Sequence, residues 1–132
     1  IEQLLTLQQK NLSRNISLQT RESQGFVTVE HTFDLLRRMS YAEPQTLAKD
    51  GPKVVGYALV MTEAFRKDIP VLEPMFDMFA GISYDGKPLV AYRYYVMGQI
   101  CIDENYRGQG ILDRLYQGQK AHLRDSYDLC IT

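Results

Sequence analysis

The chain has little cysteine. Cys101 and Cys130 are its only two, which is too few for a disulfide framework, and their spacing is not that of metal ligands. Each stands in an apolar, strand-like pattern, so we expect both to be buried, reduced thiols. The sequence therefore predicts neither a disulfide-stabilised scaffold nor a bound metal.

The chain also lacks an excess of charge and a long apolar run. Its formal net charge is −1, and Lys and Arg are scattered, so we expect no nucleic-acid partner. No apolar run approaches the roughly 18 residues that span a bilayer, and no basic start precedes an apolar core as in a signal peptide. With 45% apolar and 23% charged residues, we expect a soluble cytoplasmic protein with no membrane partner.

Residues 98–123, taken with the residues on either side, show three consecutive patterns. Residues 89–103 alternate apolar side chains as a strand does. A polar turn and the run Arg107-Gly108-Gln109-Gly110 follow. From there to about residue 125 the apolar residues recur at three- and four-residue spacing, which predicts a helix.

A strand, a glycine-bearing turn and a helix N-terminus together predict an anion site. The first-turn N–H groups have no helical partners, and the helix dipole favours negative charge. Gly108 and Gly110 let the backbone come close to a ligand, and Arg107 adds a fixed positive charge. We interpret this turn as a pyrophosphate cradle.

Two common phosphate motifs fit the turn poorly. A P-loop needs Gly-Lys followed by Ser or Thr, whereas Ile111 and Leu112 follow Gly110. A dinucleotide-binding turn needs a third glycine where Asp113 stands. A nucleotide-phosphate binder that uses the same turn remains an alternative.

The same residues closely resemble motif A of the GCN5-related N-acetyltransferases (GNATs). The family signature is Gln or Arg, two residues, Gly, one residue, then Gly or Ala. Arg107 and Gly110 meet it, and Leu112 departs from it. The resemblance implies that acetyl-CoA is a co-substrate, with its pyrophosphate at the turn and its pantetheine along the preceding strand, where Gly98 marks the family's bulge. The implied coenzyme-binding residues are Ile100, Cys101, Ile102, Arg107, Gly108, Gln109, Gly110, Ile111 and Leu112.

The resemblance implies an N-acetyltransferase in which an amine attacks the thioester directly. The acceptor would be a small-molecule or peptide amine, and a base must deprotonate it. Glu30, Glu63, Asp103 and Glu104 are candidates for this base, and we assign none as catalytic. The family's acid is often a Tyr on a later helix that this chain does not contain. A non-catalytic acyl-CoA-binding or regulatory module of the same fold is the alternative.

The remaining patterns predict one domain, residues 1–132, of mixed α+β class. We expect a GNAT-like, largely antiparallel sheet with one parallel βαβ unit and helices on both faces. The family continues with another helix and two strands, so we expect the chain to be incomplete at its C-terminus. Exposed strand edges then favour pairing with another chain, as in a homodimer.

His31 and His122 are expected at surface or edge positions. The other predicted elements are helices 1–15, 33–41 and 75–79, strands 26–30, 45–49, 54–63 and 128–132, and turns 50–53 and 84–88.

Overall fold

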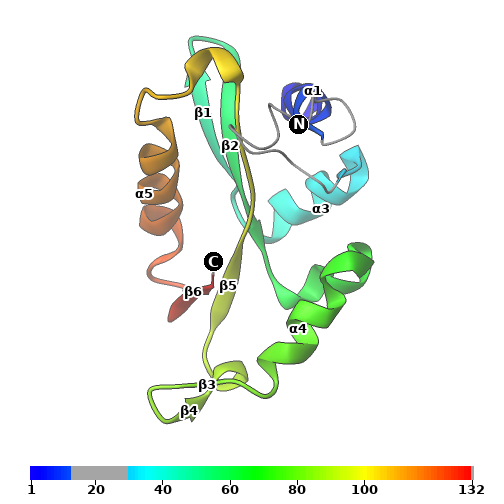
Figure 1. The fold of residues 1–132 in the computed structure, drawn as a ribbon, viewed down its shortest axis with the longest axis vertical. Coiled ribbons are helices and arrows are strands. Elements are labelled where there is room, and N and C mark those ends of the chain that lie inside the picture. Colours follow the sequence, from blue (N-terminus) through cyan, green and yellow to red (C-terminus); the bar gives the residue numbers. More distant parts are fainter. Residues whose placement is uncertain (13–29, 132) are drawn as a thin grey trace.

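A computed structural model describes residues 1–12 and 30–131. A four-stranded sheet, ordered β1-β2-β5-β6, forms its centre (Figure 1). The first three strands are antiparallel neighbours, and β5 and β6 are parallel. The predicted mixed α+β class, with a single parallel pair closing the βαβ unit, is therefore confirmed. The strands are β1 (Thr46–Asp50), β2 (Lys53–Met61), β5 (Tyr94–Ile102) and β6 (Leu129–Ile131).

Helices cover both faces of this sheet, as predicted. Helices α1 (Glu2–Asn11) and α3 (Phe33–Ala42) lie on one side, and α5 (Ile111–Leu123) lies on the other (Figure 1). Helix α1 contacts β2 and β5, whereas α5 contacts β1 and β2. Thr32 caps the N-terminus of α3 as predicted: its hydroxyl accepts the N–H of Leu35 at 3.1 Å.

Strand β2 is the centre of the core. Every residue from Val55 to Met61 is buried, because helices cover both faces of this strand and its apolar residues occupy both. Its turn to β1 contains Gly51 at φ +59°, which a hairpin turn favours. The predicted central strand is confirmed, although it ends two residues earlier than expected.

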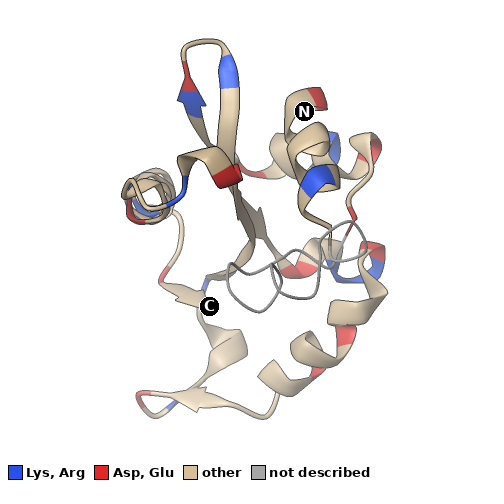
Figure 2. Ribbon diagram, turned by 45° about the horizontal axis from the view of Figure 1, so that its top comes forward, with Lys and Arg blue, Asp and Glu red and all other residues tan. Residues whose placement is uncertain are grey.

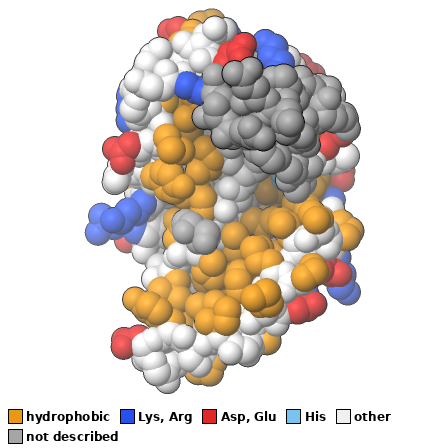
Figure 3. Space-filling model, viewed as in Figure 1, with side chains coloured by type: hydrophobic (Ala, Val, Ile, Leu, Met, Phe, Trp, Pro, Cys, Tyr) orange, Lys and Arg blue, Asp and Glu red, His pale blue; other side chains and the backbone are white. Residues whose placement is uncertain are grey.

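The segment between β2 and β5 adds a second part of the core. Phe76 and Phe79 are buried and stack edge to face, whereas Met78 is 67% exposed. This segment occupies the lower half of the view in Figure 1, and Figure 3, from the same side, shows hydrophobic side chains gathered there. The segment comprises 3-10 helices η2 (Glu63–Asp68), η3 (Pro70–Leu72) and η4 (Leu89–Ala91), helix α4 (Glu73–Phe79), and strands β3 (Ser83–Tyr84) and β4 (Lys87–Pro88).

Several predicted boundaries were wrong. The strand expected over 89–103 begins at Tyr94, because Leu89–Ala91 forms a 3-10 turn closed by the N–H of Tyr92 on the carbonyl of Leu89. Glu63 begins η2 instead of ending β2. The first helix ends at Asn11. The strand expected over 26–30 lies outside the described residues except for its last residue, which is in no strand.

A β-bulge interrupts the pairing of β2 with β5. Ala58 faces Ile100 while Val60 faces Met97, so β5 holds one extra residue opposite Leu59. A Cβ on Gly98 would lie 3.0 Å from the Leu59 carbonyl oxygen. From α5, the Gln119 side-chain amide donates to that same oxygen at 3.3 Å. The bulge predicted at Gly98 is confirmed. Any side chain at this position would require the backbone at Leu59 to move.

Gly98→Ala should therefore destabilise the fold. The added methyl meets backbone atoms of a central strand, and overpacking of this kind costs about 1–3 kcal/mol. Gly81→Ala is the control, because the nearest atom to its Cβ is 3.8 Å away, and its effect should stay within about 0.5 kcal/mol. Urea unfolding followed by circular dichroism measures both, and equal stabilities would contradict the role of Gly98.

Candidate functional site

The predicted turn lies on the surface between β5 and α5. Gly108 and Gly110 have φ of +76° and +78°, and a Cβ on either would meet nothing within 4 Å. Gly110 is the N-cap of α5 and supplies no side-chain cap. The first helical bond of α5 runs from the N–H of Arg114 to the carbonyl of Gly110 at 3.2 Å. The preceding N–H groups of α5 are therefore available to an anion.

Asp103 fixes the 3-10 helix that precedes this turn. Its carboxylate accepts the N–H of Asn105 at 2.9 Å, and its carbonyl accepts the N–H of Tyr106 at 2.9 Å, which forms the 3-10 helix η5 (Glu104–Tyr106). Asp103 is buried. This candidate base is thus used to hold the backbone that leads into the glycines.

The charge of Arg107 is anchored against the end of β5. Its Nε donates to the carbonyl of Ile102 at 3.2 Å, and its Nη2 donates to Oδ1 of Asn11 at 2.9 Å. The structure thus brings two of the predicted site residues, Arg107 and Ile102, into direct contact. The sequence pattern did not predict that α1 would contribute Asn11 to this junction.

Beyond the bulge, one edge of β5 has no strand beside it in the described chain. Strand β6 pairs with Tyr94, Tyr95 and Val96 only. The N–H of Asp103 bonds to Val55 of β2, so the alternation of an antiparallel ladder turns the backbone groups of Ile102 and Ile100 toward the other edge. That edge leads directly to the glycine turn.

Cys101 and Cys130 differ in environment. Cys101 is 5% exposed, and burial raises the pKa of its thiol to about 11, although a hydrogen bond with Tyr57 and the charge of Arg107 act in the opposite direction. The prediction of a buried thiol is confirmed for Cys101. It is wrong for Cys130, which is exposed on β6, the edge strand of the described sheet.

A buried polar cluster lies beside the bulge on the α1 side of the sheet. The Gln8 amide contacts His31 Nδ1 at 2.8 Å and Gln99 Oε1 at 2.7 Å, and the Tyr57 hydroxyl also donates to Gln99. His31 is 5% exposed, so its predicted surface position was wrong. Burial lowers the pKa of His31 and raises that of Tyr57. The one feature of the sequence that could have indicated this buried polar cluster was Gln8, a polar residue on the apolar side of the first helix.

The other base candidates have different surroundings. Glu63 lies 3.6 Å from Arg66 and accepts the Tyr94 hydroxyl at 3.3 Å. Glu30 and Glu104 are exposed. No geometry among these carboxylates singles out a base for an acceptor amine.

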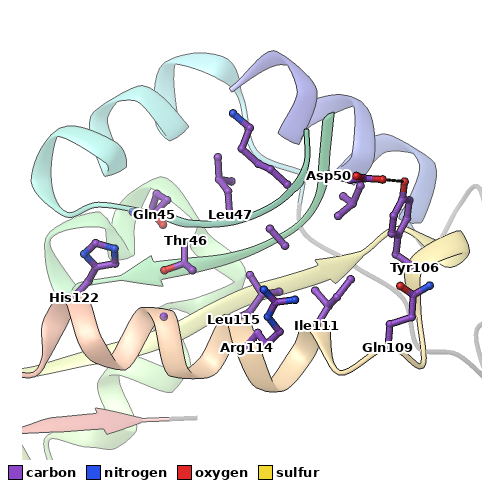
Figure 4. A pocket seen from close by; sticks show the side chains of 14 residues that line it. Gln45, Thr46, Leu47, Asp50, Tyr106, Gln109, Ile111, Arg114, Leu115 and His122 are labelled. Atoms are coloured by element: carbon purple, nitrogen blue, oxygen red, sulfur yellow. Dashed lines mark hydrogen bonds between the residues drawn. The ribbon is translucent and has the colours of Figure 1, made fainter. Parts of the chain in front are cut away.

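A groove of about 630 Å³ runs between β1 and α5 (Figure 4). Of the nine predicted coenzyme residues only Gln109 and Ile111 line it, so it adjoins the turn without following the free edge of β5. Tyr106 and Asp50 meet at 2.7 Å at its end near the turn. Thr46 Oγ1, in its wall, is buried with no hydrogen-bond partner in the described structure.

Charge is scattered over the described chain, as Figure 2 shows for Lys, Arg, Asp and Glu. Within residues 1–12 and 30–131, no His, Cys, Asp and Glu side chains group in a way that could hold a metal ion. In the same residues no helix has the length and apolarity needed to cross a membrane.

Comparison with known proteins adds no relative. No protein-family model matches the chain, and no significant match to a curated protein or a solved structure was found. Any functional assignment therefore depends on the residues and geometry described above.

The two thiols should react at very different rates with a disulfide reagent at pH 8. Cys130 should react at once because it is exposed, and Cys101 should react only on unfolding because burial and its raised pKa leave little accessible thiolate. Cys130→Ser should remove the fast phase. A fast phase that persists in this variant would contradict the burial of Cys101.

Proposed function

We propose that this chain binds acetyl-CoA and transfers its acetyl group to an amine, as a GNAT-type N-acetyltransferase. The observation that carries the proposal is the uncapped N-terminus of α5, reached through two left-handed glycines directly beyond the free edge of β5. In coenzyme A a diphosphate is joined to an extended, amide-bearing pantetheine arm. The diphosphate would lie at the N-terminus of α5 and the arm along the adjoining free edge of β5.

The turn would hold the diphosphate by its backbone. The N–H groups at the start of α5 and the positive end of the helix dipole favour phosphate oxygens. The space where a Cβ of Gly108 or Gly110 would lie is open, so phosphate can approach the main chain closely. Leu112, the departure from the family signature, is exposed and leaves this space clear.

The free edge of β5 would hold the pantetheine arm. The backbone groups of Ile100 and the N–H of Ile102 on this edge can bond to the amides of the arm as a neighbouring strand would, while the Ile102 carbonyl already accepts Nε of Arg107. The bulge at Gly98 and Gln99 takes backbone groups out of the ladder. Such groups are suited to stabilise the oxyanion that forms when the thioester carbonyl is attacked.

In the proposed reaction a neutral amine nitrogen forms a bond to the thioester carbon. The tetrahedral intermediate then collapses with cleavage of the carbon–sulfur bond, and the thiolate takes up a proton. A base must first remove a proton from the ammonium form of the acceptor. No described carboxylate is assigned that role.

Calorimetric titration with acetyl-CoA, ADP and NAD tests the ligand. We expect binding of acetyl-CoA, with ADP weaker because it lacks the pantetheine arm and NAD weaker because its diphosphate carries a second nucleoside there. Preferred binding of NAD or ADP would replace the proposal with a nucleotide-binding function. Release of free thiol from acetyl-CoA with a panel of amines then separates an enzyme from a non-catalytic acyl-CoA-binding module.

Gly110→Ala should weaken acetyl-CoA binding about tenfold or more, which corresponds to about 1.4 kcal/mol. Its methyl would enter the space proposed for the diphosphate, and alanine strains the left-handed backbone by about 1–2 kcal/mol. Gly86→Ala is the matched control, because Gly86 has φ +77° and the same open surroundings in the β3–β4 turn. Both variants should lose similar stability in urea. Equal acetyl-CoA affinities would remove the turn from the binding site.

A further inference from the structure

Helix α1 presents two buried polar side chains to the strand that carries the proposed site. Gln8 and Asn11 are one turn apart, and both are buried. A polar group placed there costs stability unless it is hydrogen-bonded. Their hydrogen-bond partners therefore contribute to holding α1 on the sheet, together with the buried Leu4 and Leu7 of the same helix.

The hydrogen bonds of Gln8 fix the protonation state of His31. Gln8 Oε1 accepts the backbone N–H of His31 at 2.8 Å, so this oxygen is identified by an obligatory donor. The Gln8 Nε2 group must then donate to His31 Nδ1 at 2.8 Å and to Gln99 Oε1 at 2.7 Å. His31 Nδ1 therefore carries a lone pair, and the imidazole is neutral.

Among residues 1–12 and 30–131, the titratable groups around His31 supply no compensating negative charge. Tyr57 of β2 and Cys101 of β5 lie in the same buried cluster, and burial raises the pKa of both, so both are neutral at pH 7. Glu30, the preceding residue, is exposed. On α3, Asp34 is exposed and bonded to two arginines, and on α1 Glu2 and Lys10 are exposed. Burial alone therefore accounts for the lowered pKa of His31.

Asn11 connects the same helix to the glycine turn. Its Nδ2 donates to the carbonyl of Leu7 at 2.9 Å, which leaves Oδ1 to accept Nη2 of Arg107 at 2.9 Å. Arg107 also holds the carbonyl of Ile102. A displacement of α1 would therefore remove a partner from the residue at which the turn begins.

We propose that α1 is a pH-sensitive latch: protonation of His31 breaks its bond with Gln8, loosens α1 from β5 and weakens ligand binding at the Arg107–Gly110 turn. A protonated Nδ1 would point its hydrogen at the Gln8 NH₂ group, so two donors would face each other. The ligand half of the proposal rests on the acetyl-CoA function proposed above, whereas the latch itself does not.

The sign of the pH dependence follows from linkage. The pKa of His31 is lower in the folded chain than its ordinary value near 6.5. The unfolded chain therefore binds more protons as pH falls below about 6.5, and folding stability is lost over that window. Above about pH 6.5, neutral His31 makes its full contribution to folding stability.

The test compares the natural chain with His31→Asn and His122→Asn. The chain has only these two histidines, and His122 is exposed on α5. Asn at position 31 keeps an acceptor for Gln8 but cannot be protonated. Between pH 7.5 and pH 5 the melting temperature should fall by several degrees in the natural chain and in His122→Asn, and should stay level in His31→Asn. Equal slopes in all three would overturn the latch.

Hydrogen exchange and a second variant locate the effect. Exchange of α1 amides, corrected for intrinsic rate, should rise at pH 5 in the natural chain while that of α5 stays unchanged. Gln8→Glu places a carboxylate beside His31 Nδ1, so it should favour protonated His31. The melting temperature of this variant should then rise, and not fall, from pH 7.5 to pH 5. A slope left unchanged by this variant, or α1 protection unchanged at pH 5, would contradict the proposal even where His31→Asn folds poorly.

Acetyl-CoA titration completes the experiment. Its affinity should fall about fivefold or more from pH 7.5 to pH 5 in the natural chain, and less in His31→Asn. The same fall in both would overturn the coupling to the turn. Failure to bind acetyl-CoA at any pH would instead remove the proposed function, and the melting and exchange measurements would still decide the latch.

Discussion

The close approach of Gly98 to the Leu59 carbonyl is the constraint on which the site depends. It lets β5 carry an extra residue without leaving β2, so the strand continues past the point where β6 stops. Two side chains hold the bulge from opposite faces. Gln119 of α5 donates to the Leu59 oxygen, and the Gln99 side chain bonds to α1 and β2.

This arrangement joins elements that are far apart in the sequence. Gln8 and Gln99 are separated by 91 positions, and Asn11 and Arg107 by 96. Both contacts connect α1 with the ends of the segment that leads into the glycine turn. Gln8 and Asn11 are buried, whereas Gln99 and Arg107 are half-buried. Hydrogen bonds to buried polar groups are costly to break, so these two contacts help to hold α1 against β5 and the turn.

Local features of the site could be predicted from the sequence because their causes are local. Glycine at positions 108 and 110 predicted a turn that L side chains rarely adopt, and the structure has left-handed backbone at both. The change from strand to helical period predicted α5 within two residues at each end. The strand predicted over 89–103 began late, because Pro88 and a 3-10 turn override the alternation of its first apolar residues.

By itself the sequence determined the mixed fold class, the central strand, the glycine turn and the helix that follows it, since each depends on the period and conformational freedom of neighbouring residues. Tertiary structure alone decided that His31 is buried and neutral, that Arg107 is held by Asn11, that Asp103 caps a turn and that Cys130 is exposed. Those outcomes depend on which distant elements pack together. No local pattern encodes the partner that a buried polar side chain finds across the sheet.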